Sequence, residues 1–174
     1  MDKPSLARKL YDHFEEVFSV VCIGTMVVCL FLQVGMRWTT GAGIPWSEEL
    51  SRFAFLWAVF SAAPVLAKHG GHVRITAQFL LMPPKYRLGF RFFADILWIA
   101  SNFLIAWWCW EVVRSGLEYP ELSPTLNIVR GYVELIIPIS FLLMNWRIAE
   151  GYIIRWRQGT LLDLVLEQSE KVEA

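Results

Sequence analysis

Four stretches of the chain are apolar and long enough to be membrane spans. The first runs without a charged residue from Val17 to Met36, about 30 Å as a helix, which matches the hydrocarbon core of a bilayer. Three further uncharged runs are shorter and reach span length only with their flanking residues: Phe53–Ala67, Ile96–Trp110 and Leu135–Trp146. Because unpaired backbone groups are not tolerated in lipid, we expect helices, over approximately residues 17–36, 46–67, 92–113 and 126–146.

Composition supports this interpretation. Of the 174 residues, 56% are hydrophobic and only 18% are charged, against about 25% charged in an ordinary soluble domain. The formal net charge is zero, which argues against a nucleic-acid partner. The first run is too long for a signal peptide, and Gln33–Arg37 is no small-residue cleavage site, so we expect it to be retained. The sequence predicts an all-α integral membrane protein with a single four-helix domain over residues 1–174.

Positive charge predicts the orientation of these helices. Most of the 16 Lys and Arg residues lie before the first span, between the second and third, or after the fourth. The other two connections hold only Arg37, Arg52, Arg114 and Arg130. By the positive-inside rule both termini are cytoplasmic. Two short amphipathic segments are predicted to lie along the inner membrane surface, one with Leu6, Leu10 and Phe14 and one with Ile75, Phe79 and Leu80.

Charged residues near the ends of the spans fall at helical spacings. Arg52 lies four residues after Glu48 and three after Glu49. The i,i+4 spacing recurs in Arg91 with Asp95 and in Arg130 with Glu134, so each acid has a local cation to pair with. The middle of every span lacks charge, whereas a pump or proton antiporter is expected to keep an unpaired carboxylate there.

The cysteine and histidine residues of the sequence give little support for catalytic or cofactor chemistry. Cys22, Cys29 and Cys109 lie in apolar runs, where thiols behave as small hydrophobic groups. The histidines, His13, His69 and His72, lie outside the spans, so they cannot hold a haem at membrane depth. We therefore expect no enzyme activity, no catalytic residue, no metal site and no cofactor in this chain. We expect membrane lipids to surround it.

Span two carries a row of small residues and a proline. Ala54, Ala58 and Ala62 recur every four residues and allow another helix to approach closely, either within this chain or on a different subunit. Pro64 and Pro138 each free a backbone carbonyl, which either a neighbouring helix or a local kink can satisfy.

The segment Pro45–Arg52 resembles a motif of one family of membrane proteins. It matches the aromatic–Ser/Thr–Glu–Glu–Leu–x–Arg segment of the DctQ-like small membrane subunits of tripartite ATP-independent periplasmic (TRAP) transporters. The segment His72–Ile75, the Met36–Trp38 end of span one and Pro138 are also similar to the family, over roughly residues 14–155. The chain departs from the family pattern at three positions, where the family often has Gly, Asp and Gly: Ser61, Thr76 and Ser140.

This resemblance implies a partner and no reaction. It implies a bacterial inner-membrane protein that serves as a scaffold for a large multispanning transport subunit, which imports organic acids such as sialic acid or C4-dicarboxylates with sodium. A periplasmic substrate-binding protein would deliver the substrate. The residues that we expect at the large subunit are Ala54, Ala58, Ala62 and His72. The expected periplasmic cluster, which either docks the binding protein or stabilises the start of the helix, is Trp46, Glu48, Glu49 and Arg52.

Two other functions remain open at this point. A homo-oligomeric channel or exporter with its pore on a symmetry axis would transport substrate without a partner. A redox membrane anchor would show a chromophore in its visible spectrum.

Overall fold

The computed structural model describes residues 6–68 and 83–159, which are almost entirely helical. The helices of this part of the chain are α1 (Leu6–Thr40), α2 (Pro45–Lys68), α3 (Pro84–Glu118), α4 (Arg130–Glu134) and α5 (Ile136–Gln158). α1 and α3 each have 35 residues. At 1.5 Å per residue each is about 52 Å long, well beyond the hydrocarbon core of about 30 Å.

The four predicted spans are confirmed, with wider bounds. Within the described residues, four segments are long and apolar enough to cross a membrane: His13–Thr40, Pro45–Ala67, Tyr86–Glu118 and Arg130–Gln158. The expected start of the fourth span near Leu126 is wrong, because the helix begins at Arg130. Leu126 lies instead in a connecting loop, residues 119–129, in which Leu122 and Val129 form an isolated antiparallel bridge.

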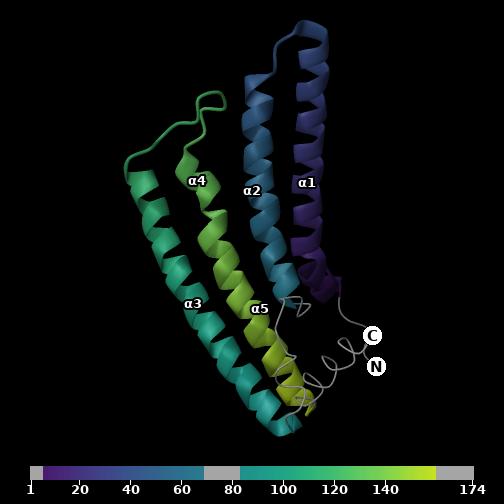
Figure 1. Ribbon diagram of the computed structural model, residues 1–174, viewed down its shortest axis with the longest axis vertical. Helices are drawn as coiled ribbons and strands as arrows, with labels where there is room; N and C mark the ends of the chain where they lie inside the picture. Colours follow the sequence, from purple (N-terminus) through teal and green to yellow (C-terminus); the bar gives the residue numbers. More distant parts are fainter. Residues whose placement is uncertain (1–5, 69–82, 160–174) are drawn as a thin grey trace.

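The helices stand side by side in a row and do not form a closed bundle (Figure 1). α1 packs on α2, α2 packs on α5, and α5 packs on α3, with α4 between the loop and α5. α1 and α3 are therefore the two edges of the row. A row exposes more apolar surface than a bundle does, which a protein tolerates only in lipid or against a partner.

Figure 1 also places the ends of the helices. The beginning of α1 and the end of α5 lie at one end of the row, here called the terminal end. The connection between α1 and α2 and the loop 119–129 lie at the opposite end, here called the loop end. The segment with Leu6, Leu10 and Phe14 is part of the continuous helix α1, and the segment with Ile75, Phe79 and Leu80 lies outside the described residues.

Two prolines explain how α2 and α5 join. Pro64 has no N–H to donate to the carbonyl of Phe60 one turn earlier, and the hydroxyl of Ser140 on α5 donates to that carbonyl instead. Pro138 likewise cannot bond to Glu134, and the helix is interrupted at Leu135, between α4 and α5. The prediction that a neighbouring helix satisfies a carbonyl freed by proline is confirmed at Phe60.

The interruption between α4 and α5 is also tied to α2. The indole Nε1–H of Trp57 donates a 2.9 Å hydrogen bond to the carbonyl of Val133, just before the break. The Ser140 side chain of α5 thus satisfies a carbonyl of α2, and the Trp57 side chain of α2 satisfies a carbonyl of α4. In lipid, where water offers no alternative partner, such bonds hold the middle of the row together.

Candidate partner interface

The seam between α1 and α2 is built from small side chains. The buried residues of α2 on this face follow helical spacing: Ser47, Ser51, Ala54, Ala58 and Ser61. Opposite them, Ser19, Cys22 and Cys29 of α1 are buried. The hydroxyls of Ser19 and Ser61 are hydrogen-bonded at 2.8 Å, and the Ser47 hydroxyl donates to the carbonyl of Cys29 at 2.8 Å. Small residues therefore let α1 and α2 approach closely enough for hydroxyls to bond across the seam.

The structure of this seam shows where the residues that we expected to contact the large subunit lie. Ala54 and Ala58 are 8% and 3% exposed and face the inside of this chain, the first of the two alternatives for the small-residue row. Ala62, one turn further along, is exposed. His72, like Thr76, lies outside the described residues.

The four residues of the expected periplasmic cluster all lie at the loop end but do not act together. Glu48 and Arg52 form the expected i,i+4 ion pair, with both side chains more than half exposed. Trp46 is 44% exposed beside them. Ion pairs this open to solvent add little stability, at most about 1 kcal/mol. These three side chains are available to a partner.

The spacing of Glu49 and Arg52 suggests an ion pair, but Glu49 has a different role. Its carboxylate accepts hydrogen bonds from the hydroxyls of Ser123 and Thr125 in the loop 119–129. It also accepts from the backbone N–H groups of Thr125 and Leu126, both at 3.1 Å. The Glu49 carboxylate thus accepts four hydrogen bonds and holds the loop against the start of α2.

A second departure from the expected pairing lies in the same loop. The i,i+4 spacing predicts an ion pair between Arg130 and Glu134, and that prediction is wrong. Arg130 pairs instead with Glu121, with 3.4 Å between Nη1 and Oε2. Arg130 is the first residue of α4, so its side chain can reach back over the loop. The predicted pair of Arg91 and Asp95 is present, at 3.9 Å between Nε and Oδ2.

Sequence reasoning missed the most buried ion pair of the described residues. The Arg147 side chain is 1% exposed, and its Nε donates to both carboxylate oxygens of Glu15 on α1, at 3.0 and 3.2 Å. Its Nη1 donates to Glu150 at 2.9 Å. The pair joins α5 to the edge helix α1, two helices that otherwise contact each other little.

The other side of α5 carries a similar set of polar contacts toward α3. The Tyr152 hydroxyl donates to Asp95, which is 4% exposed. The amide of Asn102 donates to Asn145 at 2.9 Å, and Asn145 donates in turn to the carbonyl of Ile99 at 3.3 Å. Polar residues thus tie α5, one of the two inner helices of the row, to α1 on one side and to α3 on the other.

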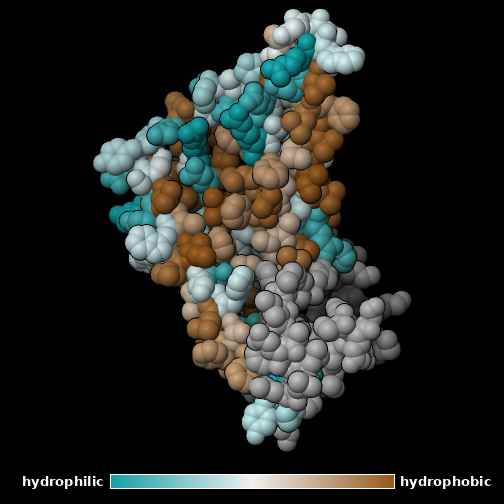
Figure 2. All heavy atoms as spheres, in the orientation of Figure 1, coloured by the Kyte–Doolittle hydropathy of each residue, from teal (hydrophilic) through white to brown (hydrophobic). Residues whose placement is uncertain are grey.

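Broad apolar surfaces remain on the two edge helices. Exposed residues of α1 include Val20, Val28 and Phe31, and exposed residues of α3 include Phe93, Leu104 and Trp107. Figure 2 shows hydrophobic side chains across the middle of one face and hydrophilic ones toward the loop end. Among the described residues, no group of three or more His, Cys, Asp or Glu could hold a metal ion.

The fold and its polar contacts define a multi-pass, all-α membrane protein. A family model described as the DctQ component of tripartite ATP-independent periplasmic transporters matches residues 26–158. The chain therefore belongs to the DctQ family of TRAP transporters.

Two relatives show how the chain compares in length. It is 25% identical over 147 residues to the sialic acid TRAP transporter small permease protein SiaQ of Vibrio cholerae, with 82% of this chain and 81% of that protein aligned. It is also 25% identical over 154 residues to the isethionate TRAP transporter permease protein DctMQ of Oleidesulfovibrio alaskensis. That match covers 85% of this chain but 24% of the relative, so the chain spans about a quarter of DctMQ.

Proposed function

We propose that this chain is the non-catalytic small membrane subunit of a TRAP transporter and acts as a scaffold for a large multispanning transport subunit. The observation that carries the proposal is the open row of helices, which leaves both edges apolar in a chain of this family. The relative DctMQ supports it, because most of that longer permease lies outside the region matching this chain.

The edge helix α1 is the surface that we assign to the large subunit. It packs on α2 along one narrow seam and exposes large aliphatic and aromatic side chains elsewhere. Val28 and Phe31, 59% and 76% exposed, lie near the middle of the span. The seam behind them is held by hydroxyl bonds and by the Glu15–Arg147 pair, so α1 presents a fixed surface.

We also infer how the chain is oriented in the membrane. The terminal end faces the cytoplasm, which agrees with Arg155 and Arg157 in the last turn of α5 and with the positive-inside rule. The loop end then faces the periplasm and offers Trp46, Glu48 and Arg52 to a substrate-binding protein. In this account sodium and the organic acid are handled by the large subunit, and no cofactor binds this chain.

A pair of matched substitutions tests the scaffold role. Val28→Trp places a bulky ring in the exposed face of α1, and Leu104→Trp does the same on α3, where Leu104 is 61% exposed. We expect Val28→Trp to reduce co-purification of the large subunit and Leu104→Trp to leave it intact. If both variants keep the complex, α1 is not the interface, and a wild-type chain that transports substrate alone would favour the channel alternative.

A further inference from the structure

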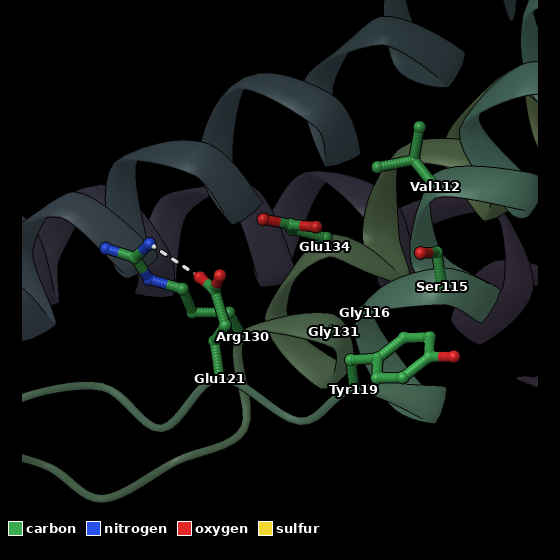
Figure 3. A pocket seen from close by; sticks show the side chains of 8 residues that line it. All are labelled: Val112, Ser115, Gly116, Tyr119, Glu121, Arg130, Gly131 and Glu134. Atoms are coloured by element: carbon green, nitrogen blue, oxygen red, sulfur yellow. Dashed lines mark hydrogen bonds and ion pairs between the residues drawn. The ribbon is translucent and has the colours of Figure 1, made fainter.

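A pocket of about 260 Å³ opens at the loop end, between the last turn of α3 and the short helix α4. Figure 3 shows its two sides. Glu121, Arg130 and Glu134 line one side, and Val112, Ser115 and Tyr119 line the other. The pocket therefore has charged groups facing hydroxyl, aromatic and aliphatic groups.

Two glycines form the junction between these sides. Gly116 of α3 and Gly131 of α4 both line the pocket. A Cβ atom on Gly131 would lie only 3.0 Å from Cδ2 of Leu117 and 3.3 Å from the carbonyl carbon of Gly116. A side chain at Gly131 would therefore crowd α3, and this close contact helps to set the distance between the two sides of the pocket.

The charges of the pocket favour a cation. Arg130 and Glu121 neutralise each other as an ion pair. Glu134 is half-buried, and across the residues that the structure describes it has no ion-pair partner, so its carboxylate leaves the pocket with a negative charge. The C-terminus of α3 adds to this, because its last turn holds no basic residue to offset the negative end of the helix dipole.

The pocket also lies at the ends of two apolar helices that are long enough to cross a membrane, and we place these ends at the level of the lipid headgroups. The third span ends at Glu118 and the fourth begins at Arg130, and residues close to both boundaries line the pocket. Tyr119, at the rim, is 72% exposed, as is common for aromatic side chains at a membrane surface. The volume corresponds to roughly nine water molecules at about 30 Å³ each, enough for a small polar headgroup.

We propose that this pocket binds a phosphoethanolamine group, the headgroup of phosphatidylethanolamine. The primary ammonium would donate to the carboxylate of Glu134 and to the hydroxyl of Ser115. The phosphate would lie toward Arg130, whose guanidinium has donors beyond the one directed at Glu121. The negative charge of Glu134, the hydroxyl of Ser115 and the guanidinium of Arg130 together match a zwitterionic headgroup better than an anionic one.

Lipid retention tests the site on the isolated full-length chain. The protein is placed in nanodiscs with equal phosphatidylethanolamine and phosphatidylcholine, and the lipids that remain bound are weighed by native mass spectrometry. Phosphatidylcholine has the same charge but no ammonium N–H, so we expect a preference of about tenfold for phosphatidylethanolamine. Equal retention of the two lipids by the wild-type chain would overturn the proposal.

Matched variants and a soluble competitor complete the test. Glu134→Gln should abolish the preference, whereas Glu111→Gln, on α3 and outside the residues that line the pocket, should keep it. A preference that survives Glu134→Gln contradicts the site. Displacement of the lipid by soluble O-phosphoethanolamine would assign the pocket to the free compound as well as to the lipid, and its failure would assign the pocket to the lipid. Because no partner is needed, this result is independent of whether the chain is a scaffold.

Discussion

The hydroxyl of Ser140 on α5 donates its hydrogen bond to the carbonyl of Phe60 on α2, the carbonyl that Pro64 leaves without a backbone donor. The proline that removes the backbone donor is on α2, and the serine that supplies a donor in its place is on α5. The bond gives Ser140 a structural role. It joins α2 to α5 at the centre of the row, and the bond from Trp57 to Val133 joins α2 to α4 beside it.

Replacing Ser140 by alanine should destabilise the protein modestly. The substitution leaves the Phe60 carbonyl without a donor, and hydrogen bonds between membrane helices are worth about 0.6 kcal/mol on average and up to about 1.7 kcal/mol. Unfolding in mixed micelles measures the loss. Ser101→Ala is the control, because the Ser101 hydroxyl bonds only to Leu97 of its own helix. Equal stability losses for the two variants would contradict a specific role for Ser140.

Replacing Arg147 by methionine should be much more damaging. It leaves the buried Glu15 carboxylate without its cation, and breaking one partner of a buried pair costs about 3–5 kcal/mol. The double variant Glu15→Gln with Arg147→Met should recover part of that loss, because the buried Glu15 charge is gone and only the more exposed Glu150 has lost its cation. Arg114→Met, at an exposed ion pair with Glu111, should change stability by less than about 1 kcal/mol. Similar losses at Arg147 and Arg114 would refute the buried pair.

Glu49→Gln should loosen the loop 119–129. Glutamine has the shape of glutamate but lacks its charge and keeps one acceptor oxygen, so the four donors of the loop lose their shared partner. Hydrogen exchange at the amides of Thr125 and Leu126 should become severalfold faster.

Glu48→Gln is the matched control for this experiment. Glu48 is adjacent in sequence but pairs with Arg52 on the exposed side of α2. Exchange in the loop should therefore stay at the wild-type rate. Faster exchange in both variants would indicate a general effect of charge at the start of α2.

Gly131→Ala should disturb the contact between α3 and α4. The new methyl group would meet Leu117 at 3.0 Å and the backbone of Gly116 at 3.3 Å, and overpacking of this kind typically costs about 1–3 kcal/mol. Gly116→Ala is a natural comparison, since its Cβ would meet Gly131 at an ordinary 3.8 Å. Thermal unfolding in detergent should rank Gly131→Ala clearly below Gly116→Ala, and the reverse order would contradict the close approach.

The sequence predicts the spans well because lipid imposes a simple rule on them. Helices that cross a bilayer must be apolar over a fixed length, so runs such as Val17–Met36 identify them directly. The start of the fourth span was missed because the polar loop before Arg130 follows no such rule. That loop is shaped by Glu49, which lies more than seventy residues earlier.

Charge pairs were predictable only along a single helix. Spacing identifies the pairs of Glu48 with Arg52 and of Arg91 with Asp95, because both partners lie on one continuous helix. It fails for Arg130, at a helix start, and for Arg147, whose partner Glu15 is 132 positions away. Arg147 counts toward the positive charge of the C-terminal segment, but its burial depends on how α5 packs beside α1.

The small-residue row of α2 shows a similar limit. Spacing indicates that another helix approaches Ala54 and Ala58, but it does not say which one. The hydroxyls of Ser19 and Ser47 show that α1 of the same chain fills this place. The small-residue row is therefore used within this chain, and the apolar surfaces that remain exposed lie on the edge helices α1 and α3.

The most direct test of the scaffold account is purification of the tagged chain from its native membrane in mild detergent, followed by mass analysis of the intact assembly. The account predicts one copy of this chain with one copy of a large multispanning membrane protein, and no transport by this chain reconstituted alone. A homo-oligomer of this chain that transports substrate by itself would contradict the account and favour a self-sufficient channel.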